Sequence, residues 1–179
     1  MTQFGRVPMQ RLTPLENARL KTYLQMNDTE DWLLWCLMEE CFLRVSEVLS
    51  LRAGDILPDG RVVCHRVKGS ETNVLPIRDA TVRYMVTEYA KGKPRKGDLL
   101  FTRSRRTLDW RLKEAGRKSG VPEEKCHAHA AKHTACQRAL DECDDNILAV
   151  QKLAGHASVD STLRYTEFSV EQALAMRRK

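Results

Sequence analysis

Residues able to bind a phosphate or transfer a proton recur in the last third of the chain. His129, Lys132 and His133 follow one another at helical spacing, Leu153-Ala154-Gly155-His156 comes next, and Tyr165 stands nine residues beyond His156. A pair of helices would gather these groups around the tyrosine. A tyrosine hydroxyl has a pKa of about 10 and is a weak nucleophile. It attacks a phosphodiester only where cations stabilise the phenolate and the pentacoordinate phosphate, so this segment predicts phosphoryl-transfer chemistry.

Two cations further upstream lie where a phosphate could bind. Arg44 stands just before a predicted short helix capped by Ser46, so its guanidinium would lie beside helix-end N–H groups. Lys68 falls at the tip of a predicted hairpin, because residues 61–67 and 73–77 show the two-residue alternation of strands. Taken alone, either residue could be an ordinary surface charge.

The elements that must position these residues form a mostly α-helical domain with a small antiparallel β-sheet (α+β). Thr13-Pro14-Leu15-Glu16 is a capping box with proline at the first helical position. Residues 32–38 are apolar nearly all round, which indicates a helix at the centre of the domain. Gly155 is the expected C-cap of the helix before it. Helices are predicted over residues 14–25, 30–42, 80–90, 107–118, 130–142 and 147–153, with others around Tyr165 and over 172–177.

A cluster of basic residues fits a polyanionic partner. The 179 residues include 30 lysines and arginines against 24 acidic residues, which gives a formal net charge of +6. A charge run is more often only a solvated face, so charge alone favours nucleic acid by a small margin. The residues predicted to contact DNA are Lys91, Lys93, Arg95, Lys96, Arg103, Arg105 and Arg106.

The composition is that of one compact domain inside the cell. Hydrophobic residues make up 42% and charged residues 30% of the chain, which is ordinary for a globular protein. No apolar run approaches the length that crosses a bilayer, and residues 1–11 do not resemble a secretion signal. The six cysteines contain no C-x-x-C pair. We therefore expect a cytosolic protein with reduced thiols and no membrane partner.

Five separated motifs together resemble the tyrosine recombinases, or phage-type integrases. Each motif is short, but their order and spacing are specific, and the resemblance covers most of residues 13–179. It implies that family's catalytic domain, and site-specific recombination of double-stranded DNA by phage-type integration or excision. The motifs are Leu43-Arg44-Val45-Ser46-Glu47, Lys68-Gly69, His129-x-x-Lys132-His133-Thr134, Leu153-x-Gly155-His156 and Tyr165-Thr166.

The resemblance also implies a reaction. Attack by the tyrosine would leave a 3′-phosphotyrosyl bond and a free 5′-hydroxyl. Because that bond keeps the energy of the phosphodiester, rejoining needs no ATP, and protein cations take the place of a metal ion or other cofactor. The implied roles are phosphate binding for Arg44, Lys132 and His156, support of the site for Glu47, proton transfer for His129, protonation of the leaving 5′ oxygen for Lys68, and nucleophilic attack for Tyr165.

The match departs from the family pattern at two positions. Lys132 stands where the family has arginine, so the site keeps the charge but loses a planar fork that binds two phosphate oxygens. By analogy with oxyanion-hole donors, we expect a loss on the order of 10²-fold in rate. Phe42 stands where the family has a small glycine, which is expected to shift the turn before Arg44.

The predicted organisation is a flexible arm over residues 1–12, a catalytic domain over 13–168 and a C-terminal helix over 169–179. That helix has an apolar face, and the resemblance implies its exchange between protomers of a tetramer on DNA. Family members commonly carry an N-terminal DNA-binding domain that residues 1–12 cannot supply. The chain is therefore expected to be a fragment or a short member that binds DNA weakly and with strong salt dependence. Its expected location is the cytosol of a bacterial host, in association with the nucleoid.

Three other functions remain open from the sequence. Lys132 would also suit a DNA-binding regulator that has lost strand cleavage. A type IB topoisomerase shares the chemistry, although the Leu-x-Gly-His spacing favours a recombinase. A zinc-binding module is the remote alternative, because possible ligands crowd together although their spacing matches no known finger. Those ligands are Cys126, His127, His129, His133 and Cys136.

Overall fold

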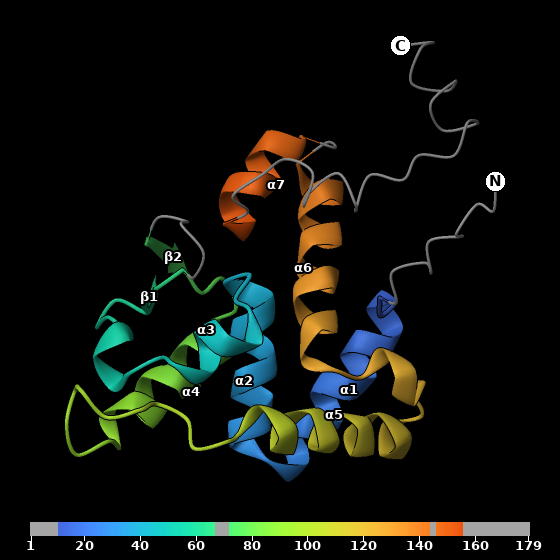
Figure 1. The fold of residues 1–179 in the computed structure, drawn as a ribbon, viewed down its shortest axis with the longest axis horizontal. Coiled ribbons are helices and arrows are strands. Elements are labelled where there is room, and N and C mark those ends of the chain that lie inside the picture. The colour runs from blue at the N-terminus through green and yellow to red at the C-terminus, as the bar shows by residue number, and fades with distance from the viewer. Residues whose placement is uncertain (1–10, 67–71, 144–145, 156–179) are drawn as a thin grey trace, which may run out of the picture.

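The computed structural model describes residues 11–66, 72–143 and 146–155. In this part the chain folds into helices and one two-stranded antiparallel sheet (Figure 1). This confirms the predicted mostly α-helical class with a small sheet. The strands are β1 (Arg61–Cys64) and β2 (Asn73–Pro76). The helices are α1 (Pro14–Asn27), α2 (Thr29–Glu40), α3 (Val45–Leu49), α4 (Ala80–Lys91), α5 (Arg105–Ser119), α6 (Ala128–Glu142) and α7 (Ile147–Ala154), with 3₁₀ turns at Ala53–Asp55 and Glu123–Lys125.

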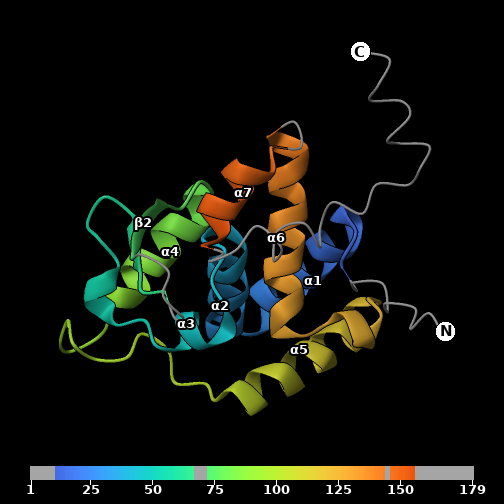
Figure 2. The ribbon, with the colours of Figure 1, turned by 45° about the horizontal axis from the view of Figure 1, so that its top comes forward.

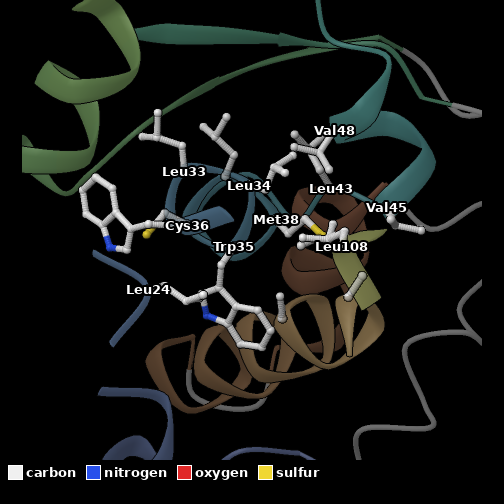
Figure 3. Packing of buried hydrophobic residues seen from close by; sticks show 14 of the residues in the cluster. Leu24, Leu33, Leu34, Trp35, Cys36, Met38, Leu43, Val45, Val48 and Leu108 are labelled. Carbon is white, nitrogen blue, oxygen red and sulfur yellow. The ribbon is translucent and has the colours of Figure 1, made fainter. Parts of the chain in front are cut away.

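The helix at the centre of the fold is α2, as its all-round apolar sequence predicted. It packs against α1, α3, α4, α5 and α6, and both views show α6 running beside it (Figures 1 and 2). Leu33, Leu34 and Trp35 are fully buried. In Figure 3 side chains leave α2 on several sides, toward Val48 of α3 and Leu108 of α5. A helix buried on all sides gives the elements around it a common, rigid support.

Local capping signals set the ends of α1 and α7. The backbone N–H of Glu16 donates to Thr13 Oγ1 at 3.2 Å, and Glu16 Oε2 accepts from the Thr13 N–H at 2.7 Å, so the predicted capping box is confirmed. The side chain of Asn146 caps the start of α7. Gly155 ends α7 in the left-handed conformation with φ 60°, also as predicted.

The start of α3 differs from the sequence-based expectation. The N-cap is Arg44, not Ser46, because the Glu47 carboxylate accepts the Arg44 backbone N–H at 2.8 Å. This is the reciprocal half of a capping box, in which an acidic N3 side chain satisfies the N-cap donor. The helix therefore begins one residue after Arg44, which fixes the backbone of the predicted phosphate-binding arginine.

The two strands pair in the predicted hairpin. Val62 lies opposite Leu75 in an antiparallel register that runs from Arg61↔Pro76 to Cys64↔Asn73. Both strands are edges of this sheet, and an edge strand tolerates a proline such as Pro76, which has no backbone N–H to donate. The predicted hairpin tip with Lys68, the helix around Tyr165 and the helix over 172–177 lie outside the described residues. Among the described helices, none is long and apolar enough to cross a lipid bilayer.

The turn between α2 and α3 contains Phe42 in a left-handed conformation with φ 53°. This is where the sequence places a phenylalanine in the position of the family's glycine, and glycine adopts such a φ without strain. The ring is buried, with 7% of the residue exposed, in a small cluster with Leu140 of α6 and Val150 of α7. The Phe42 backbone is therefore strained, and its ring packs against side chains of α6 and α7.

We expect Phe42→Gly to lower the stability of the protein. Removal of a buried phenylalanine ring costs about 3–5 kcal/mol, whereas relief of the left-handed strain returns only about 1–2 kcal/mol. The net loss should be about 2 kcal/mol in urea unfolding. The matched control is Phe42→Ala, which loses the ring and keeps the strain, so it should be the less stable of the two variants. A glycine variant more stable than the wild type would contradict this account.

Candidate active site

Arg44 is held at the N-cap of α3 by its own acidic partner. Its Nη1 donates to Glu47 Oε1 at 2.8 Å, while its backbone N–H binds the other carboxylate oxygen. About a quarter of the Arg44 side chain is exposed (24%) and none of the Glu47 side chain. The buried Glu47 thus orients the guanidinium, and the exposed part of the guanidinium remains available to bind a phosphate.

The buried carboxylate of Glu47 lies between two arginines. Its Oε2 also accepts a hydrogen bond from Arg66 Nη1 at 3.2 Å. Burial would raise the pKa of Glu47, but the N–H groups of Arg44 and the charges of Lys132 and Arg66 hold that pKa below its usual value. Glu47 therefore stays ionised at neutral pH and keeps both arginines in place, which suits the predicted supporting role.

Lys132 projects from α6 toward the end of α7. Its Nζ donates to the carbonyl oxygen of Ala154 at 2.9 Å, and only 3% of the residue is exposed. Burial, followed by the positive charge of Arg44, lowers the pKa of Lys132 to about 8. At neutral pH, Lys132 is therefore protonated in most molecules. One of its three N–H donors binds the carbonyl at the end of α7.

His129 lies on the first turn of α6, one turn before Lys132. Its ring meets His133 edge-on, with centroids 5.0 Å apart. Burial lowers the pKa of His129 below its usual value, and the charges of Lys132 and Arg44 are among the further causes. A neutral imidazole beside cations can accept a proton. His127, just before α6, also has a lowered pKa, first because of burial.

The structure therefore brings four of the predicted site residues together: Arg44, Glu47, His129 and Lys132. The charge of Arg44 acts on both Lys132 and His129, and that of Lys132 acts on Glu47 and His129. The other three predicted residues, Lys68, His156 and Tyr165, lie outside the described residues.

Sequence reasoning missed Arg66, which the structure places behind this cluster. Its side chain has no exposed surface and bonds to Glu47. One signal could have revealed it. Along β1 and its continuation, Val62, Cys64 and Arg66 recur every second residue, so they face the same side, and Val62 and Cys64 are fully buried.

The possible zinc ligands do not form one site. Cys126 is buried in the main core, whereas Cys136 is buried in the separate cluster with Phe42. Within residues 11–66, 72–143 and 146–155, no group of three or more His, Cys, Asp or Glu side chains is arranged to hold a metal ion. The geometry gives the zinc-binding alternative no support.

The basic residues predicted to contact DNA fall into two structural groups. Most are exposed on the loop after α4 and at the start of α5, among them Arg95, Lys96, Arg105 and Arg106. Lys91 pairs with Glu88, and Lys93 Nζ lies 4.8 Å from the centroid of the Tyr89 ring.

Arg103 differs from the other predicted DNA contacts because acidic side chains of the same chain bind it. Its Nη2 donates to Asp28 at 2.7 Å and its Nε to Asp31 at 3.0 Å. Arg111 of α5 pairs with the same two carboxylates. These ion pairs hold α5 and the segment just before it against the start of α2, so the structure gives Arg103 a structural role.

Comparisons with known proteins show which families and folds this chain resembles. Residues 10–172 match the family model described as the phage integrase family. The chain is 30% identical over 173 residues to the tyrosine recombinase XerA of Thermococcus kodakarensis, covering 89% of this chain and 58% of that protein. It is 30% identical over 175 residues to XerC of Bifidobacterium longum, covering 88% of this chain and 47% of the relative. The chain thus spans about half the length of these curated relatives.

Solved structures share the fold at lower identity. The Tn1549 transposon integrase in complex with transposon right-end DNA superposes with a TM-score of 0.79 at 18% identity, over 99% of this chain and 68% of that one. The XerA recombinase superposes with a TM-score of 0.73 at 21% identity, over 94% and 64% of the two chains.

Proposed function

Because this chain belongs to the phage integrase family of tyrosine recombinases, we propose that it cleaves and rejoins strands of duplex DNA through a covalent bond to Tyr165. The observation that supports this proposal is the convergence of Arg44, Glu47, His129 and Lys132, which places cations and a neutral imidazole around one partly exposed guanidinium. More specifically, we propose that these strand exchanges carry out site-specific recombination of the phage type, either integration or excision, by a tetramer on DNA.

The proposed reaction proceeds by exchange at one phosphorus atom. The Tyr165 oxygen attacks the phosphorus, the bond from phosphorus to the 5′ oxygen breaks, and a 3′-phosphotyrosyl link and a 5′-hydroxyl form. Arg44 and Lys132 neutralise the non-bridging oxygens, with His156 as a further donor. His129, held neutral by its surroundings, accepts the proton of the tyrosine, and Lys68 protonates the 5′ oxygen. Attack by another 5′-hydroxyl reverses these steps, so the cycle needs no ATP. The protein's own cations take the place of a metal ion.

The lysine at position 132 should weaken the reaction without abolishing it. Its buried ammonium keeps a positive charge beside Arg44. An ammonium has no planar fork and cannot provide the two parallel hydrogen bonds of a guanidinium, and one of its donors is already on the carbonyl of Ala154. The expected loss relative to an arginine is on the order of 10²-fold in rate.

The test is formation of a covalent protein–DNA adduct without added metal or nucleotide. The probe is a randomised duplex library with a nick in one strand, so that the short 5′-hydroxyl fragment diffuses away after cleavage and traps the intermediate. We expect an adduct that survives denaturing electrophoresis and carries an enriched DNA sequence. DNA binding without any adduct would instead identify a regulator on the same scaffold. Relaxation of supercoiled plasmid without recombinants would identify a topoisomerase.

The partners and location follow from the same proposal. Binding to DNA should weaken steeply with salt, because the exposed basic residues on the loop after α4 and at the start of α5 displace counterions from the DNA when they contact phosphates.

Exchange of the helix predicted over residues 169–179 would join the protomers of the tetramer. Analytical ultracentrifugation of the protein with its selected DNA measures that assembly. The proposed location is the host cytosol, at the nucleoid.

A further inference from the structure

Arg66 is a buried cation that the proposed mechanism does not use. Its side chain has no exposed surface, so it cannot reach a DNA phosphate. A buried charge is costly unless it is paired and hydrogen-bonded. The two terminal nitrogens of Arg66 meet this condition with four hydrogen bonds, although its Nε has no partner among the described residues. The targets of the four bonds indicate what the residue does.

The four bonds reach three separate segments. Nη1 donates to the carbonyl of Phe42 at 3.0 Å and to Glu47 Oε2 at 3.2 Å. Nη2 donates to the carbonyl of Cys41 at 3.1 Å and to that of Leu153 at 3.2 Å. A guanidinium is a planar group whose donors point in fixed directions. Arg66 therefore sets the turn before Arg44, the helix α3 and the last turn of α7 relative to one another.

Lys132 is tied to the same end of α7. It binds the carbonyl of Ala154, next to the Leu153 carbonyl that Arg66 binds. Gly155 makes this approach possible, because a Cβ at that position would lie 2.8 Å from Arg66 Nε. A continuous chain of contacts thus runs from Arg44 through Glu47 and Arg66 to the end of α7 and Lys132.

We propose that Arg66 is a positioning residue that holds Arg44 and Lys132 at the separation needed to bind one phosphate. The inference rests on the proposed strand-cleavage function. Since a small misplacement of a catalytic group can reduce a rate on the order of 10²-fold, loss of Arg66 should affect cleavage much more than DNA binding. Arg66→Met is the informative change, because methionine fills similar space and Arg44 still neutralises Glu47.

The first measurement needs no DNA. Lysine labelled with ¹³C at Cε reports the titration of Lys132, which is assigned by the signal missing in Lys132→Arg. Arg44 and Arg66 face Lys132 as cations, and Glu47 and Cys136 oppose them. The midpoint near pH 8 should move upward in Arg66→Met, since one neighbouring positive charge is gone, and should stay in Arg66→Lys. An unchanged midpoint in a folded Arg66→Met protein would overturn the coupling of Arg66 to Lys132.

The second measurement is single-turnover cleavage of a nicked duplex selected by the wild-type protein. Cleavage by Arg66→Met should fall on the order of 10²-fold, with unchanged affinity for the duplex. Arg66→Lys should be intermediate, because an ammonium can bind Glu47 but cannot reach carbonyls on both sides. Cleavage at the wild-type rate by folded Arg66→Met, or by Arg66→Lys if the methionine variant does not fold, would overturn the proposal.

The control for general loss of stability is Val82→Ala. Val82 lies on α4, is 1% exposed and belongs to the main core. Its truncation should lower the unfolding temperature but leave both the Lys132 midpoint and the cleavage rate of the folded protein unchanged. If the wild type forms no adduct with any duplex, the proposed function fails, and the titration then decides alone whether Arg66 acts on Lys132.

Discussion

Tyr165→Phe is expected to abolish the covalent adduct completely while leaving affinity for DNA unchanged. The substitution removes only the hydroxyl oxygen, which is the atom that forms the bond to phosphorus in the proposed reaction. No other change in the chain should have so large an effect on the adduct with so small an effect on structure. Adduct on denaturing gels and binding by electrophoretic mobility shift are measured on the same nicked duplex.

The other three tyrosines supply matched controls for this change. Tyr84 is exposed on α4, with 65% of the residue accessible, and Tyr23 lies on α1. Burial, followed by the charge of Glu30, raises the pKa of Tyr89 to about 12, so even less of this hydroxyl is ionised at neutral pH than in an ordinary tyrosine. Phenylalanine at any of these positions should leave the adduct unchanged. Persistence of the adduct in Tyr165→Phe, and its loss in one of the controls, would reassign the nucleophile.

Arg44→Ala is expected to slow adduct formation by about 10²- to 10³-fold. The guanidinium is the partly exposed cation of the described site, and alanine removes its hydrogen bonds to the transition state. The protein should remain folded, because Arg66 still pairs with Glu47 and the capping bond from the backbone N–H at position 44 does not need the side chain. Single-turnover rates, together with urea unfolding, separate these two effects.

Two further variants calibrate the Arg44 result. Arg44→Lys keeps the charge and loses the planar fork, so its rate should lie between those of the wild type and the alanine variant. Arg61→Ala removes the same charge from an exposed residue of β1 that pairs with Asp59. Its rate should match the wild type. Equal losses in Arg44→Ala and Arg61→Ala would mean that only the overall charge of the protein matters, which contradicts a specific phosphate contact at Arg44.

Much of the fold could be predicted because its signals are local. The Thr13 capping box, the apolar run of α2 and the C-cap at Gly155 each depend on residues within one or two turns of a helix. The predicted hairpin follows from alternation in the same way, and the resemblance to a family then indicated which of these elements carry chemistry.

What could not be predicted depends on contacts between distant parts of the chain. Arg66 binds the carbonyl of Leu153, 87 residues away, and no local sequence pattern predicts a bond between residues so far apart. The pairing of Arg103 with Asp28 and Asp31 spans more than 70 positions, and it gives this predicted DNA contact a structural role that the sequence did not indicate. The bond from Arg66 to Glu47 joins residues 19 positions apart, so the burial of Glu47 between two arginines is likewise a tertiary effect.

The most direct test of the account is identification of the residue that is linked to DNA. The trapped adduct is digested with nuclease and protease, and the modified peptide is sequenced by mass spectrometry. The proposed mechanism predicts one 3′-phosphorylated nucleotide on the oxygen of Tyr165. A nucleotide on a serine, a histidine or another tyrosine, or no covalent species at all, would contradict it.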